Sequence, residues 1–293
     1  ALMVHTTALV VRCVSAKAKS MCLGFAVSGG GIAIVVISLV LPFFIAKGPS
    51  GGWLVEAAIT FFLAAVVWRF ISMAPHEREP RPDAIQRLPP RRRRLVLLIT
   101  AAYTLMSIAV VPHTLFLADY MHRDLGLSIR DSSSLFSILG AGCAVGAIYV
   151  GPLTRLVSTR WGLSINYMMA TAAIAMVLLF DSVIVVASSA FLIGVSLFGV
   201  VALSSIRTLE IVGLSRHAHF WGGMALGFGA GMAAGSYAMS ALLSRGFHYI
   251  DLFQIAQVTV ICALIILLFA RWRYQDLENL TEKDNTQANH LTV

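Results

Sequence analysis

The sequence predicts an all-α integral membrane protein, and both its composition and the length of its apolar segments indicate this fold class. Hydrophobic residues make up 58% of the 293 residues and charged residues only 12%, whereas soluble domains carry about 25% charged residues. The mean hydropathy of +0.82 implies more apolar surface than a globular core can bury. A hydrocarbon layer about 30 Å thick needs about 20 apolar residues per helix, and such segments follow one another along this chain.

Nine apolar spans are predicted, separated by breaks that contain charged, glycine or proline residues. Only the third break is long. It is rich in proline and arginine, so we expect an extended, solvated connector between two helical bundles. The predicted spans are 1–14, 21–46, 53–73, 95–120, 133–151, 162–180, 182–206, 218–243 and 250–271.

The lysine and arginine residues predict the orientation of these spans. If the connector is cytoplasmic, only Lys47, Arg123, Arg130 and Arg245 lie outside, and the other 18 of the 22 basic residues lie inside. The opposite orientation would invert this ratio and violate the positive-inside rule. The C-terminus is therefore expected in the cytoplasm, and the net charge of +8 indicates membrane topology instead of a nucleic-acid partner.

The first predicted span is too short to cross a membrane comfortably. The chain starts at Ala1, and no signal-peptide pattern precedes this span. We therefore expect a fragment whose N-terminal helices are missing, and we expect such a fragment alone to transport poorly or not at all.

Glycine occurs repeatedly inside two of the spans. "LGFAVSGGGIA" (23–33) and "LGFGAGMAAGS" (226–236) both begin Leu-Gly-Phe after a basic break. Small residues let helices approach closely in lipid, and glycine-interrupted helices at matching positions of two halves are typical of secondary transporters. Static packing remains the alternative for each glycine. The residues expected at packing or gating faces are Gly24, Ser28, Gly29, Gly142, Gly146, Gly223, Gly227, Gly231 and Gly235.

Several stretches resemble the major facilitator superfamily (MFS), and its bacterial YbfB/YjiJ-like branch in particular. "AYTLMSIAVVPHTLFLADYMHRDLGLS" (101–128) resembles the seventh helix of that branch, and "SGGGIAI" followed by "GGW" resembles its fifth helix and the turn after it. "GPLTRLVSTRWG" (151–162) is similar to a degenerate cytoplasmic loop of the superfamily, matched at Gly151, Leu153, Arg160 and Gly162 but without the usual acidic residue.

The resemblance implies the end of helix 4 and helices 5 to 12 of a twelve-helix bundle in a bacterial inner membrane. Residues 1–73 would be the remainder of the N-terminal half, 74–94 the cytoplasmic central loop, 95–272 the C-terminal six-helix half and 273–293 a cytoplasmic tail. Members of the superfamily move small solutes by alternating access, often driven by protons. The loop residues Gly151, Arg155 and Arg160 would then help to switch states.

His113 is the strongest candidate for a transport residue, because ionisable groups inside a membrane are costly and are functional candidates by default. It follows Pro112, which loosens the helix. On a helical wheel it shares a face with aromatic and thioether groups, which suits a moderately apolar solute and a proton site. A histidine that only bonds a neighbour is the alternative. The expected substrate and proton path comprises Tyr103, Met106, His113, Thr114, Tyr120 and His5.

Two other function classes compete with proton-coupled transport of a small organic solute. A multipass membrane enzyme would need a catalytic cluster, and none of the usual hydrolase or metalloprotease motifs occurs. A membrane sensor or scaffold would need a sizeable soluble domain. The four cysteines lack metal-ligand spacing, and we expect neither a metal nor a cofactor.

Overall fold

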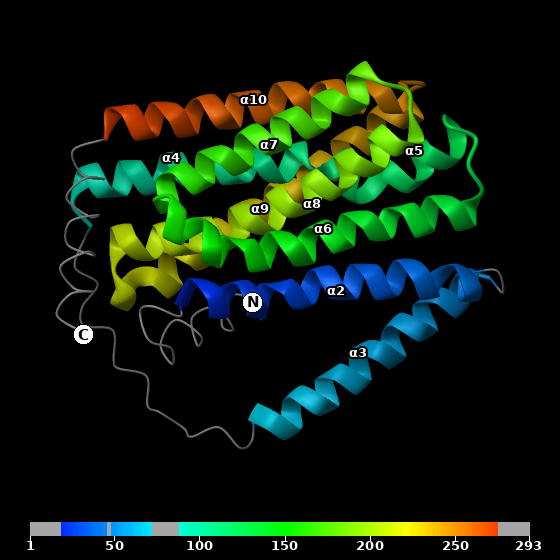
Figure 1. Ribbon diagram of the computed structural model, residues 1–293, viewed down its shortest axis with the longest axis horizontal. Coiled ribbons are helices and arrows are strands. Elements are labelled where there is room, and N and C mark those ends of the chain that lie inside the picture. The colour runs from blue at the N-terminus through cyan, green and yellow to red at the C-terminus, as the bar shows by residue number, and fades with distance from the viewer. Residues whose placement is uncertain (1–18, 46–47, 72–87, 275–293) are drawn as a thin grey trace.

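The described part of the protein is helical and runs in long segments. The structure, a computed structural model, describes residues 19–45, 48–71 and 88–274. Eight helices in these ranges are long and apolar enough to cross a membrane, and most of them lie side by side along one direction (Figure 1). The predicted all-α membrane fold is confirmed. The first predicted span, 1–14, lies outside the described residues.

Each of the other eight predicted spans corresponds to one long helical segment. The span after the connector is a single segment, Pro90–Arg123, in which a π-helical turn, η1, separates two α-helices. The elements are α2 (Lys19–Ile45), α3 (Pro49–Ile71), α4 (Pro90–Ala109), η1 (Pro112–Phe116), α5 (Leu117–Arg123), α6 (Ile129–Leu156), α7 (Thr159–Leu179), α8 (Val183–Val212), α9 (Leu214–Ser244) and α10 (Tyr249–Arg273).

Several helices extend beyond the predicted apolar spans. α4 begins at Pro90, so Arg91 to Arg94 lie in its first turns and not in the connector. α8 runs to Val212, and α9 starts two residues later. The reason is that hydropathy marks the hydrocarbon layer, while backbone hydrogen bonding continues past it and long side chains reach back to water. Gly213, with φ of 78°, makes the sharp turn between these two helices.

Polar side chains define two other helix starts. Ser128 accepts a hydrogen bond from the backbone N–H of Asp131 over 3.0 Å and so caps α6. Before α10, the backbone N–H of His248 donates to Oδ2 of Asp251 over 2.8 Å, which completes a capping box. These side chains replace the helical partners that the first N–H groups of a helix lack.

The helices after the connector form one bundle. α8 packs against α6 and α7, α10 packs against α4 and α7, and α9 packs mainly against α4. Two helices precede the connector in the sequence. Of these, α2 lies along α6, and α3 contacts α2 and then diverges from it (Figure 1). The contact between α2 and α6 therefore joins the two parts of the chain that the connector separates.

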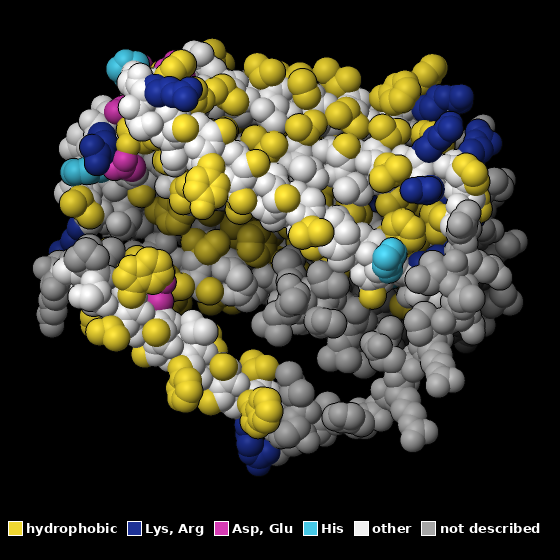
Figure 2. Space-filling model, turned by 180° about the vertical axis from the view of Figure 1, so that it is seen from behind, with side chains coloured by type: hydrophobic (Ala, Val, Ile, Leu, Met, Phe, Trp, Pro, Cys, Tyr) yellow, Lys and Arg dark blue, Asp and Glu magenta, His cyan; other side chains and the backbone are white. Residues whose placement is uncertain are grey.

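Charged side chains divide between the two ends of the bundle. We call the end where α4 begins and α10 ends the arginine-rich end. Figure 2 shows dark blue side chains gathered there, and mixed charges at the opposite end. In the described ranges the arginine-rich end carries one acidic residue, Glu210. The other described acidic residues lie near the opposite end: Glu56, Asp119, Asp124, Asp131, Asp181 and Asp251.

Candidate functional site

His113 lies in η1 and is fully buried. Proline has no N–H to donate into the helical ladder, and the widened turn begins at Pro112. Nε2 of His113 lies 2.8 Å from Oγ of Ser189 on α8, and the ring meets Phe253 of α10 edge-on, with centroids 5.0 Å apart. Widened turns of this kind occur frequently at functional sites.

The hydrogen bonds around Ser189 define the tautomer of His113. The Ser189 hydroxyl donates its only proton to the carbonyl oxygen of Ala173 on α7, over 2.6 Å. The same oxygen can therefore only accept from His113, which places the imidazole proton on Nε2. Nδ1 is buried and has no hydrogen-bond partner among the described residues. This nitrogen can therefore be protonated, or it can accept a hydrogen bond from a donor group.

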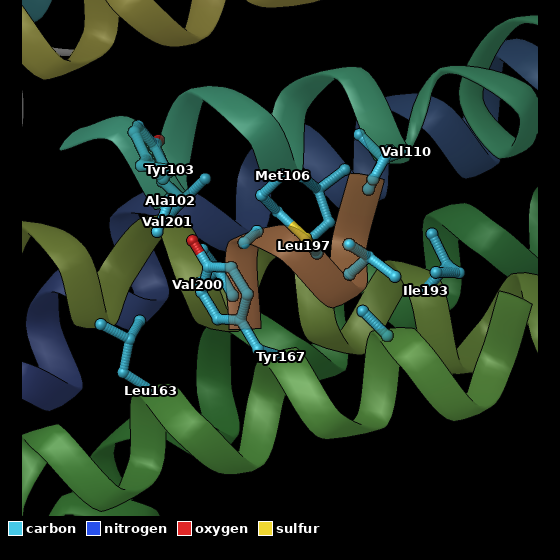
Figure 3. Packing of buried hydrophobic residues seen from close by; sticks show 14 of the residues in the cluster. Ala102, Tyr103, Met106, Val110, Leu163, Tyr167, Ile193, Leu197, Val200 and Val201 are labelled. Atoms are coloured by element: carbon cyan, nitrogen blue, oxygen red, sulfur yellow. The ribbon is translucent and has the colours of Figure 1, made fainter. Parts of the chain in front are cut away.

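Tyr103 and Met106 of α4 point into the packed bundle. Figure 3 shows both among Tyr167, Leu197 and Val200. The Tyr103 ring also packs on Phe228 of α9, with centroids 4.7 Å apart. This face was expected to line a solute path. In the described arrangement it is core, because side chains of α7, α8 and α9 cover it.

The remaining members of the expected path are more scattered. The hydroxyl of Thr114 donates to the carbonyl of Val110 in the preceding turn, over 3.0 Å. Tyr120 packs against Phe253, with ring centroids 5.4 Å apart. Tyr249 donates a hydrogen bond to Asp119, which also binds Arg123 at 2.8 Å. His5 lies outside the described residues.

The α2–α6 seam, as we call the contact between these helices, is made through backbone and small side chains. A Cβ added at Gly24 would strike the carbonyl oxygen of Ala147, and one at Gly31 would strike the backbone of Ala144. From α6, a Cβ at Gly140 would lie 2.8 Å from the backbone nitrogen of Val35. Ser28 is buried nearby, and its hydroxyl turns back to the carbonyl of Phe25. Only glycine allows this approach.

A second glycine contact lies on another face of α6, against α8. A Cβ at Gly142 would strike the carbonyl oxygen of Phe191, and one at Gly146 would strike that of Val195. Reciprocally, Gly194 of α8 faces the carbonyl oxygen of Leu139. α6 therefore touches a neighbouring backbone on two sides.

The glycines of α9 differ partly from expectation. Gly227, Gly231 and Gly235 face α4, where added Cβ atoms would meet Thr104, Ser107 and Ile108. Gly223 faces open space among the described residues, and so does Gly29 on α2. Four residues advance a helix by about 400°, so each step of four rotates about 40° and a long series leaves its starting face. Gly223 therefore lies off the face that the other three glycines of α9 turn toward α4.

Comparisons with known proteins agree with this architecture. A family model described as "Uncharacterised MFS-type transporter YbfB" matches residues 1–268. The chain belongs to this family. The predicted resemblance to the YbfB-like branch of the MFS is thereby confirmed. Curated proteins give no match.

Among solved structures, the YbfB-like chain is similar to a crystal structure of a bacterial homologue of the iron transporter ferroportin in an outward-facing state. The TM-score is 0.55 at 15% sequence identity, over 88% of this chain and 65% of that one. The chain thus spans about two thirds of the length of that transporter, and the likeness supports the fold.

Sequence reasoning missed a polar network inside the YbfB-like bundle. Asn166 is 0% exposed; its Oδ1 accepts from the hydroxyl of Tyr149 over 2.6 Å, and its Nδ2 donates to the carbonyl of Gly162 over 2.8 Å. Ser196 donates to the backbone carbonyl of Asn166 over 2.7 Å. The network joins α6, α7 and α8. A single asparagine in an apolar span was the available signal.

A second missed group lies at the arginine-rich end. Nη1 of Arg207 lies 2.8 Å from Oε2 of Glu210, whose other oxygen accepts from Thr159 over 2.7 Å. Arg207 is buried, and a buried arginine that binds a carboxylate marks a structured charge site.

Of the loop residues that the sequence singled out, Arg155 is exposed, Arg160 is partly buried, and Gly151 packs against Met21 of α2. In the described ranges, no three His, Cys, Asp or Glu residues come together as metal ligands.

Proposed function

We propose that the protein is a secondary transporter that moves a small organic solute across a membrane by alternating access, with protons as the coupling ion. The α2–α6 seam carries this proposal. It brings a helix that precedes the connector in the sequence against one that follows it. At the glycine positions the backbones are in contact, with few side chains between them. Helix contacts made through glycine, with few interlocking side chains, let one group of helices move against another, as alternating access requires.

His113 is the proposed proton site. Its buried Nδ1 has no partner in the described part of the chain, and protonation there would place a charge inside the bundle, within the π-helical turn that begins at Pro112. Such a charge is costly in lipid, so it biases whichever arrangement of helices solvates it better. Tyr103 and Met106 would then support η1 from within the core, and solute would contact other faces of the bundle.

We further propose that residues 1–73 and 95–272 form the two membrane halves. Residues 74–94, whose last part forms the first turns of α4, and residues 273–293 would then lie on the cytoplasmic side of a bacterial inner membrane. The gathering of arginine side chains at one end supports this orientation, because basic residues concentrate on the cytoplasmic side. Gly151, Arg155 and Arg160 would then lie at the cytoplasmic surface and contribute to switching.

Proteoliposomes that enclose a pH-sensitive dye test the proposed function with no single solute chosen in advance. A set of metabolites and drugs is added outside under an imposed pH gradient, and solute-dependent proton flux is measured. A proton-coupled transporter gives flux with some solutes and none with others, and empty liposomes are the control. The assay uses the product of the complete reading frame. If that protein is correctly folded, as verified by gel filtration, and moves none of the solutes, a sensor or scaffold role becomes the better account.

A further inference from the structure

A buried histidine joins the end of α8 to the start of α9 at the arginine-rich end. Nε2 of His217 on α9 lies 3.1 Å from the backbone carbonyl oxygen of Ser205 on α8 and 3.2 Å from the hydroxyl of the same serine. The turn at Gly213 connects the two helices, and His217 is 2% exposed. We call residues 204–221 the α8–α9 hairpin. The imidazole of His217 thus links the two helices of this hairpin near the turn.

His217 can take up a proton without losing its bond to Ser205. The carbonyl oxygen of Ser205 accepts from a protonated Nε2, and the Ser205 hydroxyl can donate to an unprotonated Nε2. Nδ1 of His217 forms no hydrogen bond with the described residues. One ring nitrogen is therefore always available for a proton.

The His217 imidazole also stacks on Trp221, one turn further along α9. The two ring planes differ by 4° and their centroids lie 6.5 Å apart. Nε1 of Trp221 and Oγ of Ser204 on α8 are both buried, and neither has a hydrogen-bond partner among the described residues. Buried polar atoms without partners cost free energy. The closed hairpin therefore lacks hydrogen bonds that water would supply if α8 and α9 separated there.

A positive charge on His217 would be unfavourable while the hairpin is closed. His217 lies in the first turn of α9, which carries no acidic residue, and the helix dipole is positive there. Glu210, the acidic residue at this end of the described chain, is already bonded to a guanidinium group 2.8 Å away. The titratable and charged side chains near the hairpin, on the described helices packed around it, are Arg92 and Tyr103 of α4, Arg207 and Glu210 of α8, and Arg216 and His219 of α9.

We propose that His217 is a second proton-binding site and that protonation there opens the α8–α9 hairpin at the arginine-rich end. The neutral imidazole holds the hairpin closed through Ser205 and Trp221. The charged imidazole is repelled by its basic surroundings, so it favours an arrangement in which the start of α9 moves toward water.

The place of this site in the transport cycle rests on the proposed function. His113 lies in η1, toward the opposite end of the bundle from the α8–α9 hairpin. The two imidazoles would therefore bind the coupling proton in series, one nearer each end. Loss of His113 would remove the coupling even though His217 still binds a proton.

The fluorescence of Trp221 tests the proton site. A protonated imidazole quenches an indole stacked on it, so the difference in fluorescence between wild type and Trp221→Phe should fall as the pH is lowered from about 8 to 5. His217→Gln should lose this response. The matched control His219→Gln changes an exposed imidazole two residues away and should keep it. A Trp221 signal that stays constant with pH, or that responds equally in His217→Gln, would overturn the proposal.

Hydrogen exchange of the wild-type chain in detergent tests the opening, and it remains informative if His217→Gln fails to fold. After correction for the intrinsic effect of pH on amide exchange, residues 214–221 should lose protection at low pH relative to residues 236–244 at the other end of α9. Unchanged relative protection would overturn the proposed opening. Neither measurement involves a solute. A protein that responds to pH in both but moves no solute would therefore contradict the proposed function and support this site.

Discussion

Oγ of Ser189 accepts a hydrogen bond from Nε2 of His113 over 2.8 Å and donates its proton to the carbonyl oxygen of Ala173 over 2.6 Å. One hydroxyl thus connects η1, α7 and α8 in the interior of the bundle. A buried imidazole fixed from one side, with its second nitrogen unpaired among the described residues, combines structural order with the capacity to take up a proton.

We expect Ser189→Ala to destabilise the protein by about 1–3 kcal/mol, because the buried N–H of His113 loses its acceptor. Ser188→Ala is the matched control. The Ser188 hydroxyl is exposed and donates to the carbonyl of Ile184 in its own helix, so the effect of this control should stay within about 0.5 kcal/mol. Denaturant unfolding in detergent measures both variants. Equal stability of the two would mean that the Ser189 hydrogen bond contributes nothing.

We expect His113→Ala to abolish the pH dependence of solute transport, because the proposed proton site is then absent. The control is His219→Ala, which removes an exposed imidazole near the start of α9 and should leave the pH profile unchanged. Initial rates of uptake into proteoliposomes across a series of pH values provide the measurement. A His113→Ala variant that transports with the wild-type pH profile would exclude this residue from coupling.

Two glycine substitutions on one helix should have opposite effects. Gly31→Ala places a Cβ against the backbone of Ala144, whose Cα would lie 2.8 Å away, and forcing α2 from α6 should cost about 1–3 kcal/mol. Gly29→Ala meets nothing within 4 Å and should stabilise the helix by about 0.5–1 kcal/mol. Thermal unfolding in detergent separates the two cases. A neutral Gly31→Ala would contradict the close contact between α2 and α6.

We expect Arg81→Cys in the connector and Arg155→Cys to be labelled by an impermeant maleimide from the cytoplasmic side, and Arg130→Cys from the outer side. The physical reason is the concentration of basic residues on the cytoplasmic side of a membrane. Labelling of intact cells and of inverted vesicles, in a background without Cys13, Cys22 and Cys262, gives the sidedness. If Arg81→Cys and Arg155→Cys react from opposite sides, the proposed topology is wrong.

The helical spans could be predicted from the sequence because membrane crossing requires a stretch of apolar residues that is directly visible there. Their ends could not be predicted to the residue. Arg91 to Arg94 are as polar as any loop, yet they lie in α4, because backbone hydrogen bonds form as readily in the headgroup region as in the hydrocarbon.

The site was less predictable than the spans. His113 stood out as an ionisable residue in an apolar span, but its partner Ser189 is one of many serines in such spans, and only the packing of α4, α7 and α8 brings the two together. Which side of α4 packs into the core could not be predicted from the sequence either. A face with Tyr103 and Met106 suits a solute path or a core, and the choice depends on which helices cover it.

The backbone contacts on two faces of α6 have a mechanical consequence. Where a layer of side chains separates two helices, changes of rotamer can accommodate small displacements of one helix relative to the other. α6 lacks such a layer at its glycine contacts with α2 and α8, so side-chain rotamer changes at these contacts cannot absorb a displacement of either neighbour. Any shift of α2 relative to α6 must therefore be a slip of one whole rod past another, and not a local repacking of side chains.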